Sequence, residues 1–235
     1  METQRNSRFT VETGVEDLLA AILPHVPFDG WSEPAFKAAV EDLGVEMPLA
    51  RVICPRGAVD LAVAYHRAGD RAMEAALAAS DMSALKFREK VTLAVRLRLA
   101  SADLELVRRG ASLFALPQNA GTGGKLIWGT ADAIWTALGD TSRDFNWYSK
   151  RATLSAVYGS TVLYWLGDDS LGHQATWAFL DRRIEDVMQI EKLKAAVKAN
   201  PLGKALLAGP AKLMEKWRVP TVPDDLPGRI RNPFR

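Results

Sequence analysis

Residues 139–154 bring together the side chains best suited to recognition chemistry. Trp147 and Tyr148 stand beside Asp144, Lys150 and Arg151, at the start of a predicted helix where a soluble helix ordinarily carries Glu, Lys and Ala. Aromatic residues and Arg are enriched in protein interfaces and supply much of their binding energy. The stretch therefore predicts a recognition surface, with Trp147 and Tyr148 as its anchors.

Side chains suited to catalysis are scattered along the chain. The three histidines, His25, His66 and His173, are far apart, and none belongs to a Glu-x-x-His or His-Glu-x-x-His pairing. We interpret each of them as a solvated or capping residue rather than a metal ligand. The single cysteine, Cys54, excludes an internal disulfide and is expected to be a small core residue.

Residues 121–125, Gly-Thr-Gly-Gly-Lys, are similar to part of a phosphate-binding loop, but the pattern is incomplete. Asn119 stands where the loop needs its first glycine, and Leu126 replaces the Ser or Thr that would bind magnesium. We interpret the stretch as a loop at the start of a helix. The sequence therefore predicts a protein that is not an enzyme, with no catalytic residue, no metal and no cofactor.

The stretch 139–154 closely resembles a segment of the Coq-nine family, the accessory proteins of ubiquinone biosynthesis. The similarity extends to residues 116–119 and 131–135 before it and to residues 177–184 after it. It covers most of residues 110–200 and is weak at the amino-terminal end. The resemblance implies a TetR-like helical fold that holds lipid between its helices and has no enzymatic activity.

A ligand and a partner also follow from the resemblance. The ligand would be an isoprenoid lipid or quinone intermediate, and the partner the di-iron hydroxylase that acts on demethoxyubiquinone. The resemblance then assigns the docking patch for the hydroxylase to five residues: Ile134, Asp144, Trp147, Tyr148 and Arg151.

The predicted helix over residues 142–167 is apolar nearly all round and carries four small residues on one face: Ala152, Ser155, Ala156 and Gly159. Such a face lets either a neighbouring helix or a ligand tail approach the backbone closely. The residues leave both possibilities open, and the resemblance favours a lipid cavity. The predicted lipid-binding residues are Phe114, Leu116, Ile127, Trp128, Ala152, Leu154, Ser155 and Gly159.

Helical periodicity runs through almost the whole chain and predicts an all-α protein. Ala, Leu and Arg recur at helical spacing, and alternating runs of Val, Ile and Thr between turns are missing. Short helices are predicted over about 15–25, 32–43 and 48–54, a layout typical of a helix-turn-helix. Longer helices are predicted over about 56–81, 83–109, 123–138, 142–167 and 172–199, and a last one over about 201–217.

Charge separates the two ends of the chain. Residues 1–55 carry nine acidic and four basic groups, a net charge of −5, and the predicted recognition helix offers only Arg51 to DNA. A DNA-binding protein must neutralise phosphates, so we predict a degenerate module and no nucleic-acid partner. A TetR-type DNA-binding transcription regulator that responds to a hydrophobic ligand is the alternative. The predicted parts are 1–55 (degenerate helix-turn-helix), 56–200 (lipid-binding domain), 201–218 (amphipathic helix) and 219–235 (irregular tail).

Residues 192–218 carry seven basic groups and one acidic group, a net charge of +6. Their apolar side is predicted to bind a membrane interface through Leu202, Leu206, Leu213, Met214 and Trp217. A basic amphipathic helix with a Trp suits anionic headgroups, although packing on its own body or on a partner helix is the alternative. With no signal, transit or spanning segment evident, we expect a protein of the bacterial cytoplasm, peripheral on the inner membrane. In a eukaryote the corresponding location would be the matrix side of the mitochondrial inner membrane. The TetR-like fold that the resemblance implies often dimerises, so we also expect a homodimer.

Overall fold

A computed structural model of this 235-residue chain describes residues 14–142 and 145–199. This part consists of ten α-helices and one 3-10 helix and contains no strand, which confirms the all-α prediction. In chain order the elements are α1 (Gly14–Ile22), α2 (Val26–Asp29), α3 (Glu33–Leu43), α4 (Met47–Ile53), α5 (Ala58–Ala79), α6 (Phe87–Ala100), α7 (Leu104–Ala115), α8 (Pro117–Ala137), α9 (Phe145–Leu166), η1 (Leu171–His173) and α10 (Gln174–Ala199).

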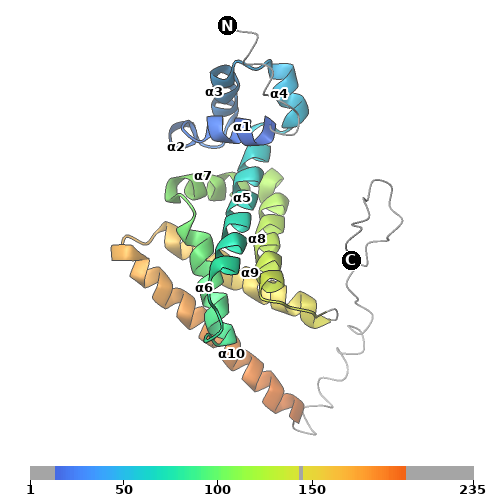
Figure 1. Ribbon diagram of the computed structural model, residues 1–235, viewed down its shortest axis with the longest axis vertical. Coiled ribbons are helices and arrows are strands. Elements are labelled where there is room, and N and C mark those ends of the chain that lie inside the picture. Colours follow the sequence, from blue (N-terminus) through green and yellow to red (C-terminus); the bar gives the residue numbers. More distant parts are fainter. Residues whose placement is uncertain (1–13, 143–144, 200–235) are drawn as a thin grey trace, which may run out of the picture.

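Helices α1 to α4 form a small module at one end of the molecule, and α5 leads from it into the larger helical body (Figure 1). Local signals set its boundaries. The Ser32 side chain caps α3 by accepting a hydrogen bond from the Ala35 amide at 3.4 Å, and Gly44 ends that helix with φ of 64°. Both devices satisfy backbone groups that a helix end leaves unpaired.

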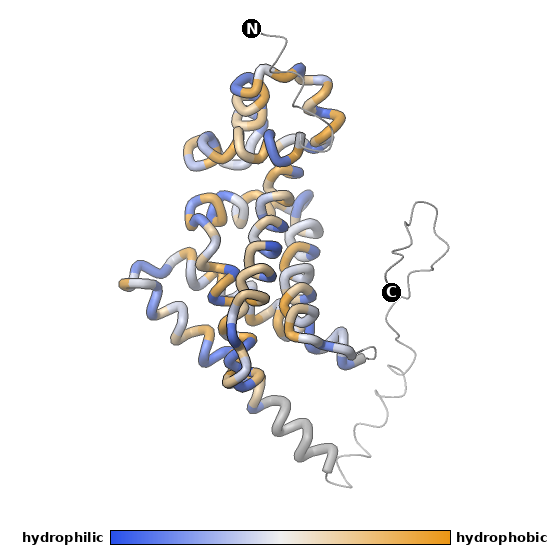
Figure 2. Tube along the Cα trace, viewed as in Figure 1, coloured by the Kyte–Doolittle hydropathy of each residue, from blue (hydrophilic) through white to orange (hydrophobic). Residues whose placement is uncertain are grey.

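Two hydrophobic cores correspond to the module and the body. The module core is centred on residues such as Phe36 and Leu61, and Leu106 of α7 joins it. The body core is built from α5, α6, α8, α9 and α10, with Ile134 and Leu180 fully buried. Apolar and polar residues alternate along these helices, as Figure 2 shows, so each helix turns one side to the core.

The predicted helix over residues 83–109 is wrong, because the chain forms two helices there. Asp103 interrupts the run and caps α7, its carboxylate accepting from the amides of Glu105 and Leu106 at 2.9 and 3.0 Å. Helix α7 can therefore leave the direction of α6 and lie between the module and the body (Figure 1).

Helix α8 begins at Pro117, earlier than predicted, so residues 121–125 are helical and not a loop. Proline suits the first turn of a helix, and tertiary packing outweighs the weak helix propensity of the glycines that follow. Gly123 is needed for this packing, because a Cβ atom there would lie 2.9 Å from the Cβ of Phe114 on α7.

Several sequence predictions lie outside the described residues. They are Asp144 of the docking patch, the helix over residues 201–217 with its membrane-binding residues Leu202, Leu206, Leu213, Met214 and Trp217, and the tail that follows. Among the helices that are described, none is both long and apolar enough to cross a membrane.

Candidate functional site

Three aromatic side chains meet where α8 packs on the start of α9. Trp147 and Tyr148 are in edge contact, with ring centroids 4.8 Å apart, and Trp128 of α8 lies 5.9 Å from the first and 6.5 Å from the second. All three side chains are half-buried. We call Trp128, Trp147 and Tyr148 the aromatic cluster. Trp128 was predicted to line the lipid cavity, and the structure places it here instead.

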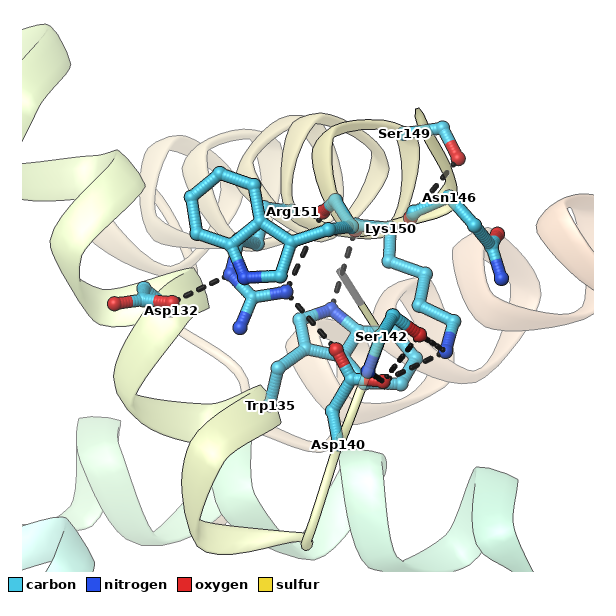
Figure 3. Close-up of polar contacts among 9 residues, drawn as sticks. Asp132, Trp135, Asp140, Ser142, Asn146, Ser149, Lys150 and Arg151 are labelled. Atoms are coloured by element: carbon cyan, nitrogen blue, oxygen red, sulfur yellow. Dashed lines mark hydrogen bonds and ion pairs between the residues drawn. The ribbon is translucent and has the colours of Figure 1, made fainter. Parts of the chain in front are cut away.

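A charged network supports this cluster from below. The Arg151 guanidinium lies 4.1 Å from the centroid of the Trp147 ring and donates to Asp132 at 2.5 Å and to Asp140 at 3.0 Å. Lys150 binds the other Asp140 oxygen at 2.7 Å (Figure 3). A guanidinium that is paired with two carboxylates has a fixed orientation, so it holds the Trp147 ring in place.

Asp140 is the centre of the charged network, with a side chain that is only 4% exposed. Burial alone would raise the pKa of its carboxyl. Hydrogen bonds from Lys150, Ser142 and Arg151 outweigh that effect and hold the pKa well below its usual range. The Asp140 carboxyl is therefore ionised at physiological pH.

The predicted docking patch is only partly on the surface. Ile134 is fully buried in the body core, and Arg151 is 2% exposed, so neither forms the surface of the patch. The sequence did not reveal this, because the partners of Arg151 lie 11 and 19 residues away, beyond any helical spacing. Trp147 and Tyr148 remain as the patch residues that reach solvent in the described part.

A second candidate site is a cavity of about 330 Å³ between α5, α6, α7, α8 and α9. Phe114, Ile127 and Gly159 line it, as predicted. This volume lies at the lower end of the range of ligand pockets, about 300 to 1,000 Å³. Several apolar residues that the sequence did not single out complete its wall: Leu99, Ala102, Val107, Ala111, Leu126 and Val162.

The remaining predicted lipid-binding residues do not line this cavity. Leu116 is 44% exposed at the start of α8, and Ala152 is exposed on α9. Leu154 lines a separate groove of about 300 Å³ between α6, α8, α9 and α10. The Ser155 hydroxyl is buried without a hydrogen-bond partner among the described residues. The small-residue face of α9 therefore does not line a single cavity.

Next to the cavity lies a buried polar network that the sequence did not predict. His66 of α5 contacts the Thr130 hydroxyl of α8 at 2.8 Å, and Arg98 of α6 donates to Asp70 of α5 at 2.7 Å. Burial, together with the nearby Arg98 charge, lowers the pKa of His66 to about 4. His66 is therefore a neutral part of the body interior, and its interpretation as a solvated or capping residue was wrong.

The Arg51 side chain, which the predicted recognition helix offers to DNA, is paired within the module. Arg51 of α4 is hydrogen-bonded to Glu33, and its guanidinium lies 4.7 Å from the centroid of the Phe36 ring.

Cys54 is 1% exposed, which confirms that it is a core residue, and burial raises the pKa of its thiol to about 11. No group of side chains in the described ranges has the composition of a metal site.

Comparison with known proteins identifies a family that this chain resembles. Residues 120–191 match the COQ9 family model, so the matched region begins in α8, includes all of α9 and ends within α10. It contains the whole aromatic cluster and the charged network. The Coq-nine resemblance read from the sequence is thereby confirmed.

Similar proteins extend the likeness along most of the chain. The ubiquinone biosynthesis protein COQ9, mitochondrial, of Rattus norvegicus is 29% identical over 86% of this chain and 70% of its own. The protein of the same name from Homo sapiens is 29% identical over 82% of this chain and 62% of its own. The probable ubiquinone biosynthesis protein coq9, mitochondrial, of Dictyostelium discoideum is 30% identical over 75% of this chain and 60% of its own. The chain thus spans roughly two thirds of the length of these relatives.

Proposed function

Because this chain is a COQ9-family ubiquinone biosynthesis protein, we propose that it is a non-enzymatic, lipid-binding accessory protein of that pathway. It binds isoprenoid quinone intermediates and presents them to the di-iron hydroxylase that acts on demethoxyubiquinone. The observation that carries this proposal is the cavity of about 330 Å³ with its largely apolar wall, inside a body that contains the COQ9 domain.

The physical need for such a protein comes from the ligand. A polyprenyl chain gains roughly 0.8 kcal/mol for each methylene group removed from water, so it does not leave a bilayer unaided. A cavity walled by Leu, Val, Ile and Phe side chains offers part of that chain an equivalent environment. The protein would then lower the cost of bringing the intermediate to an enzyme.

The aromatic cluster would be the docking site for the hydroxylase. Trp147 and Tyr148 are half-exposed, and large aromatic residues held in a fixed orientation make strong interface anchors. Arg151 and Asp140 supply this preorganisation from below. Asp144, which lies outside the described residues, belongs to the same proposed patch.

Two further parts of the proposal rest on the sequence. Residues 201–217 would lie in the membrane interface and bring the cavity close to the bilayer, and the chain would act as a homodimer. The bacterial cytoplasm, at the inner membrane, is the proposed location. The relatives named above are mitochondrial, so the matrix side of the mitochondrial inner membrane would be the corresponding location in a eukaryote.

Blocking the cavity tests the central proposal. Ala111 lines the cavity on α7, and Ala111→Phe should fill part of it, so native mass spectrometry of the gently purified protein should show much less bound isoprenoid. Ser112 is exposed on the same helix, and Ser112→Phe is the matched control that should retain the lipid. An unmodified protein that carries no lipid, or an Ala111→Phe protein that carries as much as the unmodified one, would contradict lipid binding in this cavity.

A further inference from the structure

Helix α4 of the module turns an apolar strip to solvent. Pro48, Leu49 and Val52 lie on its outer side, where Val52 is 70% exposed and Leu49 is 37% exposed. The inner side of the helix joins the module core through the buried Ala50. Figure 2 shows hydrophobic colouring along most of this helix. We call Pro48, Leu49 and Val52 the apolar strip.

Neither helix stability nor DNA binding accounts for the apolar strip. Valine forms helices less well than Ala, Lys or Glu, so helix propensity does not explain Val52 at a position open to solvent. A helix that reads DNA presents hydrogen-bonding side chains to the base edges, and the side chains of the strip have none. Neighbouring apolar side chains on the open side of a helix are typical of a surface that another protein segment covers.

The apolar strip lies in acidic surroundings. Residues 14–55 carry seven acidic groups and two basic groups, a net charge of −5. Glu33, Glu41 and Glu46 are exposed, and Glu46 stands directly before α4 without capping it through its side chain. Arg51, the basic group of α4, is already hydrogen-bonded to Glu33. The strip and its surroundings therefore fit a partner that is apolar on one side and positively charged on the other.

The chain itself contains a segment with this chemistry. Residues 192–218 carry a net charge of +6, and the predicted helix over residues 201–217 has an apolar side with Leu206 and Leu213. The module and this segment thus have opposite and nearly equal charges. Opposite charges orient two surfaces and speed their encounter, while burial of apolar side chains holds them together.

The distance along the molecule indicates which copy supplies the segment. The carboxyl-terminal end of α10 lies at the opposite end of the molecule from the module, beyond the whole of α5 (Figure 1). Helix α5 has 22 residues and is therefore roughly 33 Å long. A helix over residues 201–217 is only about 25 Å long and begins two residues after α10 ends. In helical form it does not reach the apolar strip of its own chain.

We propose that the apolar strip of α4 binds residues 201–217 of a second copy of this chain. The two surfaces in this contact differ, so the contact is of the head-to-tail kind and can exist beside a two-fold dimer. It gives the degenerate helix-turn-helix module a role as the acceptor of a basic amphipathic helix. The apolar side of that helix faces either the strip or a bilayer, so the contact belongs to the protein away from membranes. The inference does not rest on lipid binding in the cavity or on docking of the hydroxylase.

Disulfide cross-linking between two full-length variants, without vesicles, tests the proposal. One protein carries Val52→Cys and the other carries Leu206→Cys, and the two are mixed under mild oxidation. The native Cys54 is 1% exposed and its thiol has a raised pKa, so it stays out of the exchange. The disulfide between the two different proteins should be the main covalent product.

Matched cysteines at other positions show whether the reaction is specific. Ala75→Cys, exposed on α5 outside the module, replaces Val52→Cys in one control. Ala208→Cys, on the polar side of the predicted helix, replaces Leu206→Cys in the other. Each control should lower the yield of the mixed disulfide several-fold.

Charge variants test the complementarity on which the choice of partner rests. Glu46→Lys in the Val52→Cys protein should lower the yield about two- to fivefold, the range for an exposed charge pair. Glu74→Lys makes the same charge change at an exposed position of α5, and its effect should be smaller. The yield should also fall as the salt concentration rises. Circular dichroism should show that both proteins remain folded.

Each contrary result overturns a defined part of the proposal. If the Val52→Cys protein links mainly to itself, α4 meets α4 of a second copy and the chosen segment is wrong. If a protein with both Val52→Cys and Leu206→Cys forms the disulfide within one chain, the second copy is excluded. Equal yields from Val52→Cys and Ala75→Cys would show that the apolar strip is not the binding surface. Equal losses with Glu46→Lys and Glu74→Lys would show that net charge alone, and not the acidic surroundings of the strip, attracts the segment.

Discussion

Arg151 stabilises the protein and orients the aromatic cluster at the same time. It neutralises Asp132 and Asp140 while its guanidinium supports the Trp147 ring. Trp147 itself is half-buried and contributes to the surface, so the two residues should respond to mutation in opposite ways. Mutation of Trp147 therefore tests docking, and mutation of Arg151 tests folding.

We predict that Trp147→Ala weakens pulldown of the di-iron hydroxylase and leaves Tm nearly unchanged. Arg151→Ala should instead cost on the order of 3 kcal/mol, because it leaves Lys150 as the remaining cation beside the buried Asp140 carboxylate and removes a buried guanidinium from the packing. For a chain of this size that corresponds to a fall in Tm on the order of 10 °C, measured by calorimetry. If Trp147→Ala unfolds the protein, the aromatic cluster belongs to the core and the assignment of a docking patch is wrong.

His66 makes stability depend on pH. Its folded-state pKa of about 4 lies below the usual value of 6.5, since burial and the charges of Arg98 and Arg67 outweigh the opposing effect of Asp70. Below about pH 6.5 the unfolded chain binds a proton that the folded protein does not bind until about pH 4. Stability is therefore lost as the pH falls through that window, by up to about 3 kcal/mol.

Urea unfolding at pH 7 and pH 4.5 checks this prediction. The free energy of unfolding should fall more in the wild type than in His66→Gln, which has no titrating group at this position. All other titratable groups are the same in both proteins, so the difference between them isolates His66. Equal losses in the two proteins would show that His66 is protonated in the folded state at the lower pH.

At the scale of elements, α7 connects the module to the body and forms one wall of the cavity. Its amino-terminal end is held by Asp103, which caps two amides, and it lies between the module and the body (Figure 1). Residues of α7 such as Val107, Ala111 and Phe114 line the cavity. The position of this helix therefore affects both stability and ligand retention.

Asp103→Ala should remove the α7 cap and cost about 1 kcal/mol, a fall in Tm of about 2 to 4 °C. It should also shorten the time for which a bound isoprenoid is retained, measured by native mass spectrometry after dilution. Asp81 provides the control, because its carboxylate accepts from the Ser83 amide in the loop between α5 and α6. If Asp81→Ala releases lipid as fast as Asp103→Ala, a specific role for the α7 cap is excluded.

At the scale of the whole molecule, the cavity must meet a bilayer to load its ligand. The predicted helix over residues 201–217 has an apolar side with Leu206 and Leu213 and a polar side rich in lysine. Apolar burial in the interface and attraction to anionic lipid would act together. The full chain is therefore expected to bind vesicles that contain anionic lipid.

Changing Leu206 and Leu213 together to Glu should abolish cosedimentation of the full-length protein with anionic vesicles. Changing Ala208 and Ala211 together to Glu alters the charge equally on the polar side of the predicted helix, so it should reduce binding only partly. Equal loss in the two variants would point to net charge alone, and the apolar side would then have no part in membrane binding.

Short-range signals in the sequence were sufficient to predict the all-α class, several helix ends and the family resemblance. Helical periodicity predicted the all-α class, and the capping signals at Ser32 and Gly44 predicted a helix of the module. Capping and amphipathic patterns act over a few residues, so they can be read from the sequence. The adjacent Trp147 and Tyr148 were visible for the same reason. The cap at Asp103 and the proline start of α8 were also readable, but continuous helical periodicity and the glycines of residues 121–125 led to the wrong boundaries.

The packing of the helices set which side chains share a site. It buried Ile134 in the body core and Arg151 beneath Trp147, and it joined Trp128 to the aromatic cluster. It also brought His66 and Arg98 to the wall of the cavity, from positions 32 residues apart in the chain. Burial and ion pairing depend on how helices pack against each other, and residues this far apart leave no periodic signal in one sequence.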